Sequence, residues 1–343
     1  MRIVVILLIV AIALVYASPD YFDILDNEFE QELNGEERTF YIAAEESIWD
    51  YSSQSKNPNV TDVSILGTRY YKALYHEYQD ANFTKKKSRF HWQGNMGPIL
   101  RAEVGDTIRI HFWNKCSYNF TMHPHGVFYE FEMEGAVFKD SYEEGIVQPN
   151  QTYIYHWHVL PRAGPGPKDG NSIVWGYHSH VEETDVYAGL YGAIVIYKPG
   201  KLSNDDIVTS LFVSDENYSP YLRRTLSELY PKVDVAKMEE NEFYQINTFP
   251  SVNGLASSAP TDLVIKKPVD WHLLGWGTYW DVQNVKWEHG EITWSDAIVD
   301  QIRLMPASFY TVTMHPKTNG KYLFGALNNR TAGMVMQYTV KLS

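Results

Sequence analysis

The sequence predicts an all-β fold of two β-sandwich domains in tandem. From Thr39 onward, short runs rich in tyrosine, isoleucine, valine and tryptophan alternate with turn signals, a spacing that is typical of sandwiches and barrels. With 343 residues, the chain is too long for one ordinary core and suits two domains. Two runs in the first half, 149–155 and 188–195, resemble 306–312 and 332–339 in the second, which indicates one fold used twice.

The chain opens with a predicted export signal. A short charged start precedes an apolar run that ends at Val15 and is followed by small residues, so we expect a signal peptide of residues 1–17, cut near Ala17. A retained membrane anchor is the alternative, and no later stretch is long and apolar enough to cross a bilayer. Residues 18–38 are acidic and poor in β-branched side chains, which indicates a mobile leader or a short edge element.

The predicted strands belong to two domains, which a polar linker separates. We expect the first domain at 39–199, the linker at 200–206, where turn residues and charges gather, and the second domain at 207–343. A Pro/Gly-rich loop at 161–170 joins two strands, and a charged stretch at 223–242 with some helical period predicts a surface helix or loop. The clearest predicted strands are 40–43, 107–112, 152–159, 193–197 and 207–213.

Charge, glycosylation signals and cysteine content narrow the class of protein. The formal net charge of -13 argues against nucleic acid or an anionic membrane as a partner, and an acidic surface tolerates cations. Because Cys116 is the only cysteine, no intrachain disulfide can form, and stability must come from the cores, with bound metal as a possible further source. Six Asn-x-Ser/Thr sequons are typical of an exported glycoprotein: Asn59, Asn82, Asn119, Asn150, Asn217 and Asn329.

Two His-x-His pairs are the predicted metal ligands: His123 with His125, and His178 with His180. Each pair lies at a predicted strand end, where the period of two places both imidazoles on one face. Four histidines on neighbouring strands can converge on one metal centre, and neutral imidazole suits copper, zinc, iron and nickel. The alternative is that such pairs arise by chance or as core histidines, but two pairs in similar glycine-containing settings favour a metal site.

The other histidines carry less weight. His156 and His158 form a third pair on one face of a predicted strand, which we interpret as a solvated strand face. Isolated histidines, which we expect to have no functional role, are His272, His289 and His315.

Ordered motifs along the chain from about Thr39 resemble a known family. They lie at 49–51, 71–75, 97–106, 123–126, 134–136, 177–181, 215–218, 251–254 and 271–275. Together they resemble the ceruloplasmin and hephaestin family of copper ferroxidases and, more distantly, the A domains of blood-coagulation cofactors. The resemblance implies two cupredoxin-like Greek-key β-sandwiches in tandem.

The resemblance also implies a role for the paired histidines. Oxidases of this family take electrons from substrate at a blue copper held by two His, a Cys and a Met, and pass them to dioxygen at a trinuclear cluster held by four His-x-His pairs from two domains. By resemblance, His123 lies where a ligand of the cluster's single copper would be. His125, His178 and His180 lie where ligands of its coupled copper pair would be, so the first domain keeps half of the site.

The second domain departs from the family pattern. Read without a gap, Gln283, Lys286 and Glu288 stand where the blue-copper His and the third His-x-His pair are expected, and a one-residue insertion recovers only His289. A Gly-Ala-Leu stretch, 325–327, replaces the family's His-Cys-His, and of the blue-copper set only Met334 remains. The missing Cys matters most, because its thiolate makes the strong copper bond.

Other family features are also altered. Cys116 lies on the strand leading to His123, away from any ligand position, and is interpreted as a small buried hydrophobe. Ser172 and Tyr197 stand where the family's disulfide would be. The family's calcium loop is shortened around 140–145, which argues against a calcium site.

Two functions remain open at this stage. The first is a secreted copper-binding protein with half of a trinuclear site, which has oxidase or ferroxidase activity only when another chain completes the site. That chain is either a copper-bearing partner or a second copy in a two-fold homodimer. The second is a non-enzymatic extracellular binding scaffold, in which the four histidines hold one structural copper or zinc or are a relic.

Overall fold

Strands dominate the structure, as the sequence predicts. The computed structural model describes residues 34–51, 66–137, 145–234, 244–256, 260–278, 281–326 and 333–342, and the following statements concern these residues. The strand at Thr107–Asn114 shows the underlying pattern, because buried Ile108, Ile110 and Phe112 alternate with partly exposed neighbours. The predicted runs at 40–43, 107–112, 193–197 and 207–213 all lie within strands, and 152–159 forms a strand that ends one residue earlier.

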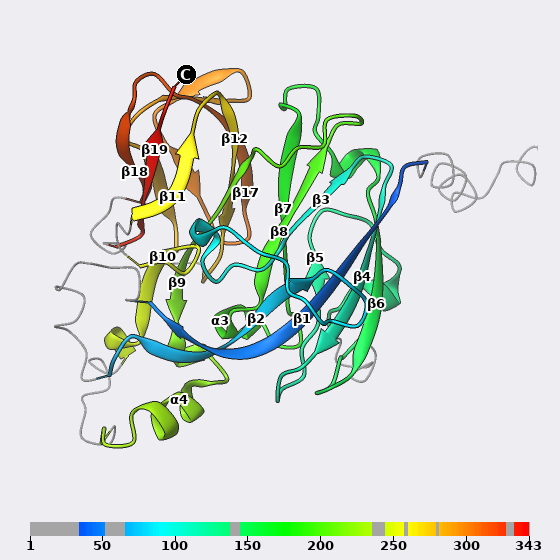
Figure 1. Ribbon diagram of the computed structural model, residues 1–343, viewed down its shortest axis with the longest axis vertical. Helices are drawn as coiled ribbons and strands as arrows, with labels where there is room; N and C mark the ends of the chain where they lie inside the picture. The colour runs from blue at the N-terminus through cyan, green and yellow to red at the C-terminus, as the bar shows by residue number, and fades with distance from the viewer. Residues whose placement is uncertain are drawn as a thin grey trace, which may run out of the picture.

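Residues 37–197 form two four-stranded sheets, ordered β2-β1-β4-β6 and β3-β8-β7-β5 (Figure 1). Their strands are β1 (Glu37–Asp50), β2 (Arg69–Tyr78), β3 (Ile99–Glu103), β4 (Thr107–Asn114), β5 (His123–Pro124), β6 (Thr152–His158), β7 (Ser172–His178) and β8 (Tyr191–Tyr197). The first strand begins at Glu37, two residues before the expected start of the first domain at 39, because Glu37 and Arg38 pair with Thr107 and Ile108 of β4. The predicted signal peptide, residues 1–17, lies outside the described residues.

Residues 207–340 form a six-stranded sheet, β10-β9-β12-β17-β14-β15, and a five-stranded sheet, β11-β19-β18-β13-β16. Their strands are β9 (Ile207–Asp215), β10 (Thr248–Val252), β11 (Pro260–Ile265), β12 (Val269–Gly275), β13 (Gln283–Trp287), β14 (Glu291–Trp294), β15 (Ala297–Val299), β16 (Ile302–Leu304), β17 (Phe309–His315), β18 (Gly320–Ala326) and β19 (Val335–Val340). Trp271 fills the space between these sheets, with its ring centroid 4.6 Å from that of Phe324 and 5.6 Å from that of Tyr338.

Helical segments are short. The predicted helix or loop at 223–242 contains α4 (Leu222–Leu229), and part of the remainder lies outside the described residues. None of the described helices has the length and apolar character that crossing a bilayer requires. The other helical segments are η2 (His91–Gln93), η3 (Phe131–Met133), η4 (Pro161–Ala163), α3 (Asp185–Ala188) and η5 (Glu216–Tyr218).

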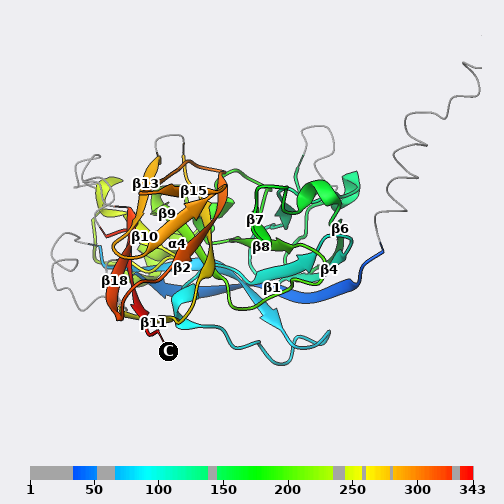
Figure 2. The same cartoon turned by 90° about the horizontal axis from the view of Figure 1, so that it is seen from above.

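The two pairs of sheets lie side by side, and β1 and β2 run along one side of both (Figure 2). β8 ends at Tyr197 and β9 begins at Ile207, so the strands of the two halves separate at the segment expected to be a linker. The exact domain boundaries at 199 and 207 stay predictions. A buried ion pair joins the halves, because Lys72 Nζ on β2 lies 2.6 Å from Glu216 Oε1 on η5.

Candidate metal centre

Strands β5 and β7 bring the two His-x-His pairs together. They pair antiparallel with His123 directly opposite His178, so the period of two places His125 and His180 beside them. Gly126 allows the chain to turn away immediately after His125. It has a φ of 78°, and a Cβ atom at this position would lie 2.0 Å from Trp175 Cδ2.

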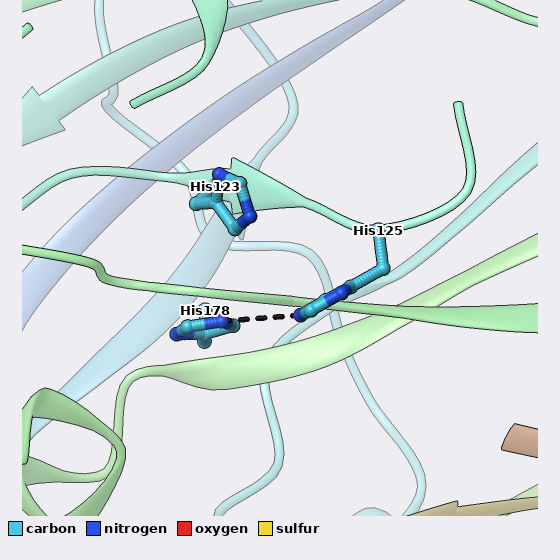
Figure 3. Close-up of side chains that lie close together, drawn as sticks. All are labelled: His123, His125 and His178. Carbon is cyan, nitrogen blue, oxygen red and sulfur yellow. Dashed lines mark hydrogen bonds between the residues drawn. The ribbon is translucent and has the colours of Figure 1, made fainter. Parts of the chain in front are cut away.

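All four predicted ligands lie in one partly buried cluster, and Figure 3 shows three of them. The ring centroid of His123 lies 5.3 Å from that of His125, 5.5 Å from that of His178 and 5.0 Å from that of His180. Ligand nitrogens of His123, His125 and His178 lie within 4.8 Å of one another. His180 is outside that trio, although its ring centroid lies 5.3 Å from that of His178. No other group of three or more converging His, Cys, Asp or Glu side chains occurs in the described part of the chain.

Three histidines of the cluster have neutral imidazole rings, which can bind a metal cation. Nδ1 of His123 donates to the Glu134 carbonyl oxygen at 2.8 Å, and Nδ1 of His178 donates to that of Ser179 at 2.8 Å, which leaves each Nε2 as an electron-pair donor. Burial lowers the pKa of His123 and of His125 to about 4, and that of His178 well below its usual range. These three imidazoles are therefore neutral at pH 7, the state that binds metal.

His125 and His178 face each other directly. Their Nε2 atoms lie 3.2 Å apart, as the dashed line in Figure 3 marks. Imidazole nitrogens that lie this close together are the kind of donors that a transition-metal ion prefers. The donor chemistry of the cluster thus fits copper or zinc better than calcium or magnesium.

A buried polar network supports the strand end that carries His178 and His180, and sequence analysis did not identify it. Ser179 Oγ donates to Asp185 Oδ2 at 2.6 Å and accepts the Thr121 amide at 3.1 Å, while Thr121 Oγ1 accepts the His180 amide at 2.9 Å. Asp185 Oδ2 also accepts the Val181 amide at 3.1 Å, and burial raises the pKa of Asp185 to about 6. The available signal was the acidic residue at the start of α3, a few residues after the second pair.

Aromatic rings from the second half contact the cluster. The Phe309 centroid lies 5.3 Å from that of His125, and the Trp276 centroid lies 5.5 Å from that of His178. The backbone of β7 makes this contact close, because a Cβ on Gly176 would lie 2.6 Å from Phe309 and 2.7 Å from Trp276. Side chains that exclude water, rather than metal ligands, therefore approach from this side.

The residues that the resemblance places at the family's other ligand positions have different surroundings. Gln283 is buried on β13, whereas Lys286 and Glu288 are exposed. His289 Nε2 accepts the Thr318 amide at 3.0 Å, and its ring stacks on Tyr322 with centroids 4.2 Å apart. Gly325 and Ala326 lie on β18 and Met334 is fully buried, while Leu327 is outside the described residues.

The structure supports the interpretation of Cys116 as a buried hydrophobe, but the residue lies in the loop after β4, which ends at Asn114, and not on the expected strand. Its side chain is 3% exposed in the core of the first half, and burial raises the pKa of its thiol to about 12. Ser172 and Tyr197 lie opposite each other in the β7–β8 pairing, and Ser172 Oγ donates to Asp270 at 3.1 Å. Residues 140–144 of the shortened calcium loop lie outside the described residues.

Comparison with known proteins agrees with this fold. A family model for multicopper oxidases matches residues 76–201, which include both His-x-His pairs. Ferroxidase HEPHL1 of Homo sapiens is 32% identical over 337 residues, which cover 88% of this chain and 29% of that protein. Ceruloplasmin of Rattus norvegicus is 30% identical over 89% of this chain and 32% of that protein. Hephaestin of Homo sapiens is 29% identical over 90% of this chain and 30% of that protein.

Solved structures extend the comparison of the fold. The multicopper oxidase mgLAC superposes with a TM-score of 0.58 at 15% identity, covering 90% of this chain and 87% of that one. A second multicopper oxidase superposes with a TM-score of 0.55 at 18% identity, covering 89% of this chain and 88% of that one. These likenesses confirm the cupredoxin-like all-β fold.

The chain spans about a third of the length of the ferroxidase relatives it matches. On these observations, the chain belongs to the multicopper oxidase family and is related to ceruloplasmin, hephaestin and ferroxidase HEPHL1.

Proposed function

We propose that this chain is an exported copper-binding protein in which His123, His125, His178 and His180 supply half of a copper centre. The observation that carries the proposal is the convergence of these four rings, three of them with ligand nitrogens within 4.8 Å of one another. Copper bound at this position would supply a one-electron redox couple. The protein's own contribution is to hold neutral imidazoles in place and, through Trp276 and Phe309, to exclude water.

We further propose that the chain has no electron-entry copper of its own. Lys286 and Glu288 are exposed and Gly325 and Ala326 have no ligand atom in their side chains, so these positions offer no imidazole or thiolate. Oxidase or ferroxidase activity would then require a second chain to supply the missing ligands. That chain is either a copper-bearing partner or another copy of this protein, and it would approach from a side that Trp276 and Phe309 do not occupy.

Export is part of the proposal. It rests on the apolar start of the sequence and on the sequons, of which Asn82 and Asn150 are exposed. The sequon at Asn217 is not expected to carry a glycan. Its amide donates to Asp215 at 2.7 Å and to the Tyr244 carbonyl at 3.0 Å, so the side chain is engaged within the protein.

The experiment that tests copper binding compares natively purified protein with two variants. We expect His178→Ala combined with His180→Ala to lose the copper held by the four-histidine centre, measured as a fall in metal per chain by mass spectrometry, while its circular dichroism remains that of a β-rich fold. The control is His91→Ala, which removes an exposed imidazole and leaves the copper content unchanged. Full copper loading of the double variant would overturn the ligand assignment.

A second candidate function is a non-enzymatic extracellular scaffold, and the aromatic contact of Trp276 and Phe309 with the cluster favours it. The two functions predict different numbers of copper ions per chain. Two or more coppers per chain that the His178→Ala and His180→Ala double variant lacks, or several such coppers per dimer with part of them silent in electron paramagnetic resonance through coupling, would support a completed centre. One metal ion or none per monomer, with no oxidation of iron(II) or organic reductants, would support the scaffold.

A further inference from the structure

The third histidine pair lines a cavity, which differs from the solvated strand face expected from the sequence. A cavity of about 400 Å³ is lined by the partly buried side chains of His156 and His158, and burial lowers the pKa of His158. The remaining described residues that line the cavity are Gly35, Glu36, Glu37, Gly105, Thr107, Glu130 and Met133.

Strand pairing fixes both imidazoles on one face of β6. His158 lies opposite Thr107 of β4, and its Nδ1 is 3.2 Å from Thr107 Oγ1. His156 lies opposite Arg109, two residues earlier on the same face. Arg109 is itself paired with Glu37 at 3.2 Å, which reduces its repulsion of a cation near His156.

Met133 of the short helix η3 also lines this cavity. The Met133 carbonyl oxygen accepts Trp157 Nε1 at 3.1 Å, and its amide donates to the Glu130 carbonyl at 2.8 Å, so η3 is tied to the strand between the two histidines. Two imidazoles with a thioether form a soft donor set, which selects copper(I) over calcium or magnesium.

The charge around the cavity favours a cation. Glu36, Glu37 and Glu130 line it, and no lysine or arginine is among its described lining residues. Arg38 lies 3.5 Å from Glu36 and Arg109 lies 3.2 Å from Glu37, so Glu130 carries most of this effect. A bare acidic cluster would suit a hydrated hard cation, but the combination of Met133 with two imidazoles makes the donor set specific for a softer metal.

We propose that this cavity is a second metal site, which binds one copper(I) ion through His156, His158 and Met133. The site uses no residue of the four-histidine centre and does not depend on that centre being loaded. It would be a labile site at the protein surface, since its ligands lie on β6 and on a three-residue helix rather than between two buried strand ends.

The test is an anaerobic copper(I) titration of metal-free full-length protein against a chromophoric copper(I) chelator. In the background of His178→Ala with His180→Ala, we expect one copper(I) per chain to remain. Adding His156→Ala and His158→Ala should remove it. The matched control is His111→Ala, a partly buried histidine of β4 whose ring centroid lies 5.0 Å from that of Tyr41 and which is not among the residues that line the cavity.

Met133→Leu tests the ligand set without the loss of an imidazole. This swap nearly conserves volume and is expected to leave the fold intact. Copper(I) affinity should fall by about tenfold or more, the scale of a lost ligand contribution, while zinc(II) affinity stays the same. X-ray absorption of the copper(I) form should show a sulfur scatterer that Met133→Leu removes.

Three results would overturn the proposal. The first is unchanged copper(I) stoichiometry after loss of His156 and His158. The second is no sulfur scatterer in the protein with Met133 present, and the third is tighter binding of zinc(II) than of copper(I) with no effect of Met133→Leu. Failure of the four-histidine centre would appear separately, as full copper loading of the His178 and His180 double variant.

Discussion

Backbone carbonyls orient the imidazoles of His123 and His178, and a single buried carboxylate braces the strand end that carries His178. Asp185 accepts the Val181 amide and the Ser179 hydroxyl, and Ser179 in turn holds Thr121 near the first pair. Asp185 contacts none of the predicted ligands through its side chain in these bonds, so it acts as a positioning residue.

We predict that Asp185→Ala weakens metal binding and destabilises the protein. The change leaves the buried Ser179 hydroxyl and the partly buried Val181 amide without their acceptor, which costs about 1–3 kcal/mol in the free energy of unfolding. It also lets His178 and His180 move, which lowers copper affinity by about 10–100-fold. Chemical denaturation and chelator competition measure the two effects. Glu183→Ala, an exposed neighbour, is the control, and equal behaviour of the two variants would contradict the bracing role.

Glu45 on β1 carries a pH-dependent part of the stability. Burial alone would raise its pKa, but hydrogen bonds from Lys86, Tyr78 and Lys115 outweigh burial and lower the pKa from 4.5 to about 2. A carboxyl group whose pKa is lower in the folded state stabilises the protein above its unfolded pKa. That contribution disappears as the pH falls from about 4.5 to about 2.

We therefore expect Glu45→Gln to be less stable than the parent protein near pH 6, with the difference shrinking as the pH falls toward 2. Urea unfolding at a series of pH values measures it. A difference in unfolding free energy that stays constant over this range would refute the assignment. Glu37→Gln, on the same strand and more exposed, provides the comparison.

At the scale of elements, the tight exit from β5 places the first histidine pair. We predict that Gly126→Ala destabilises the protein by about 2 kcal/mol or more, because it combines a positive φ with a clash against Trp175. Gly200→Ala is the matched control. Its φ is 71° but no atom lies within 4 Å of the added Cβ, so only the conformational cost of about 1 kcal/mol applies. Equal unfolding free energies for the two variants would exclude the clash.

At the scale of the whole molecule, a buried ion pair links the two halves. The side chains of Lys72 and Glu216 are each 1% exposed, and Glu216 also accepts the Tyr51 hydroxyl at 2.6 Å. Burial lowers the pKa of Lys72 and raises that of Glu216, and their mutual attraction opposes both shifts. Loss of either partner leaves a buried charge uncompensated.

We predict that Lys72→Met costs about 3–5 kcal/mol in the free energy of unfolding and that adding Glu216→Gln recovers part of the loss. Lys267→Met removes an exposed pair with Asp205 and should change stability by about 1 kcal/mol or less. Denaturant unfolding of the four proteins measures the effects. No recovery in the double variant would mean that Lys72 contributes through packing instead of charge.

Much of the fold could be predicted because strand patterns are local. Alternating burial in residues such as Ile108, Ile110 and Phe112 follows directly from the order of side chains, and the run at 193–197 lies within β8. The start of β1 at Glu37 could not be predicted, since pairing with β4 overrides its acidic composition. Such pairings depend on residues far away in the chain.

The candidate site, like the fold, has some features that the sequence predicts and others that only the tertiary structure shows. The sequence by itself determined the all-β class, the two His-x-His pairs and the family, because side-chain identity and the period of two are local properties. Only the tertiary structure decided that His123 lies opposite His178, that Trp276 and Phe309 contact the cluster, and that His156 shares a cavity with Met133. The physical reason is that strand register and packing are set by contacts between distant segments, and no local pattern encodes which segments meet.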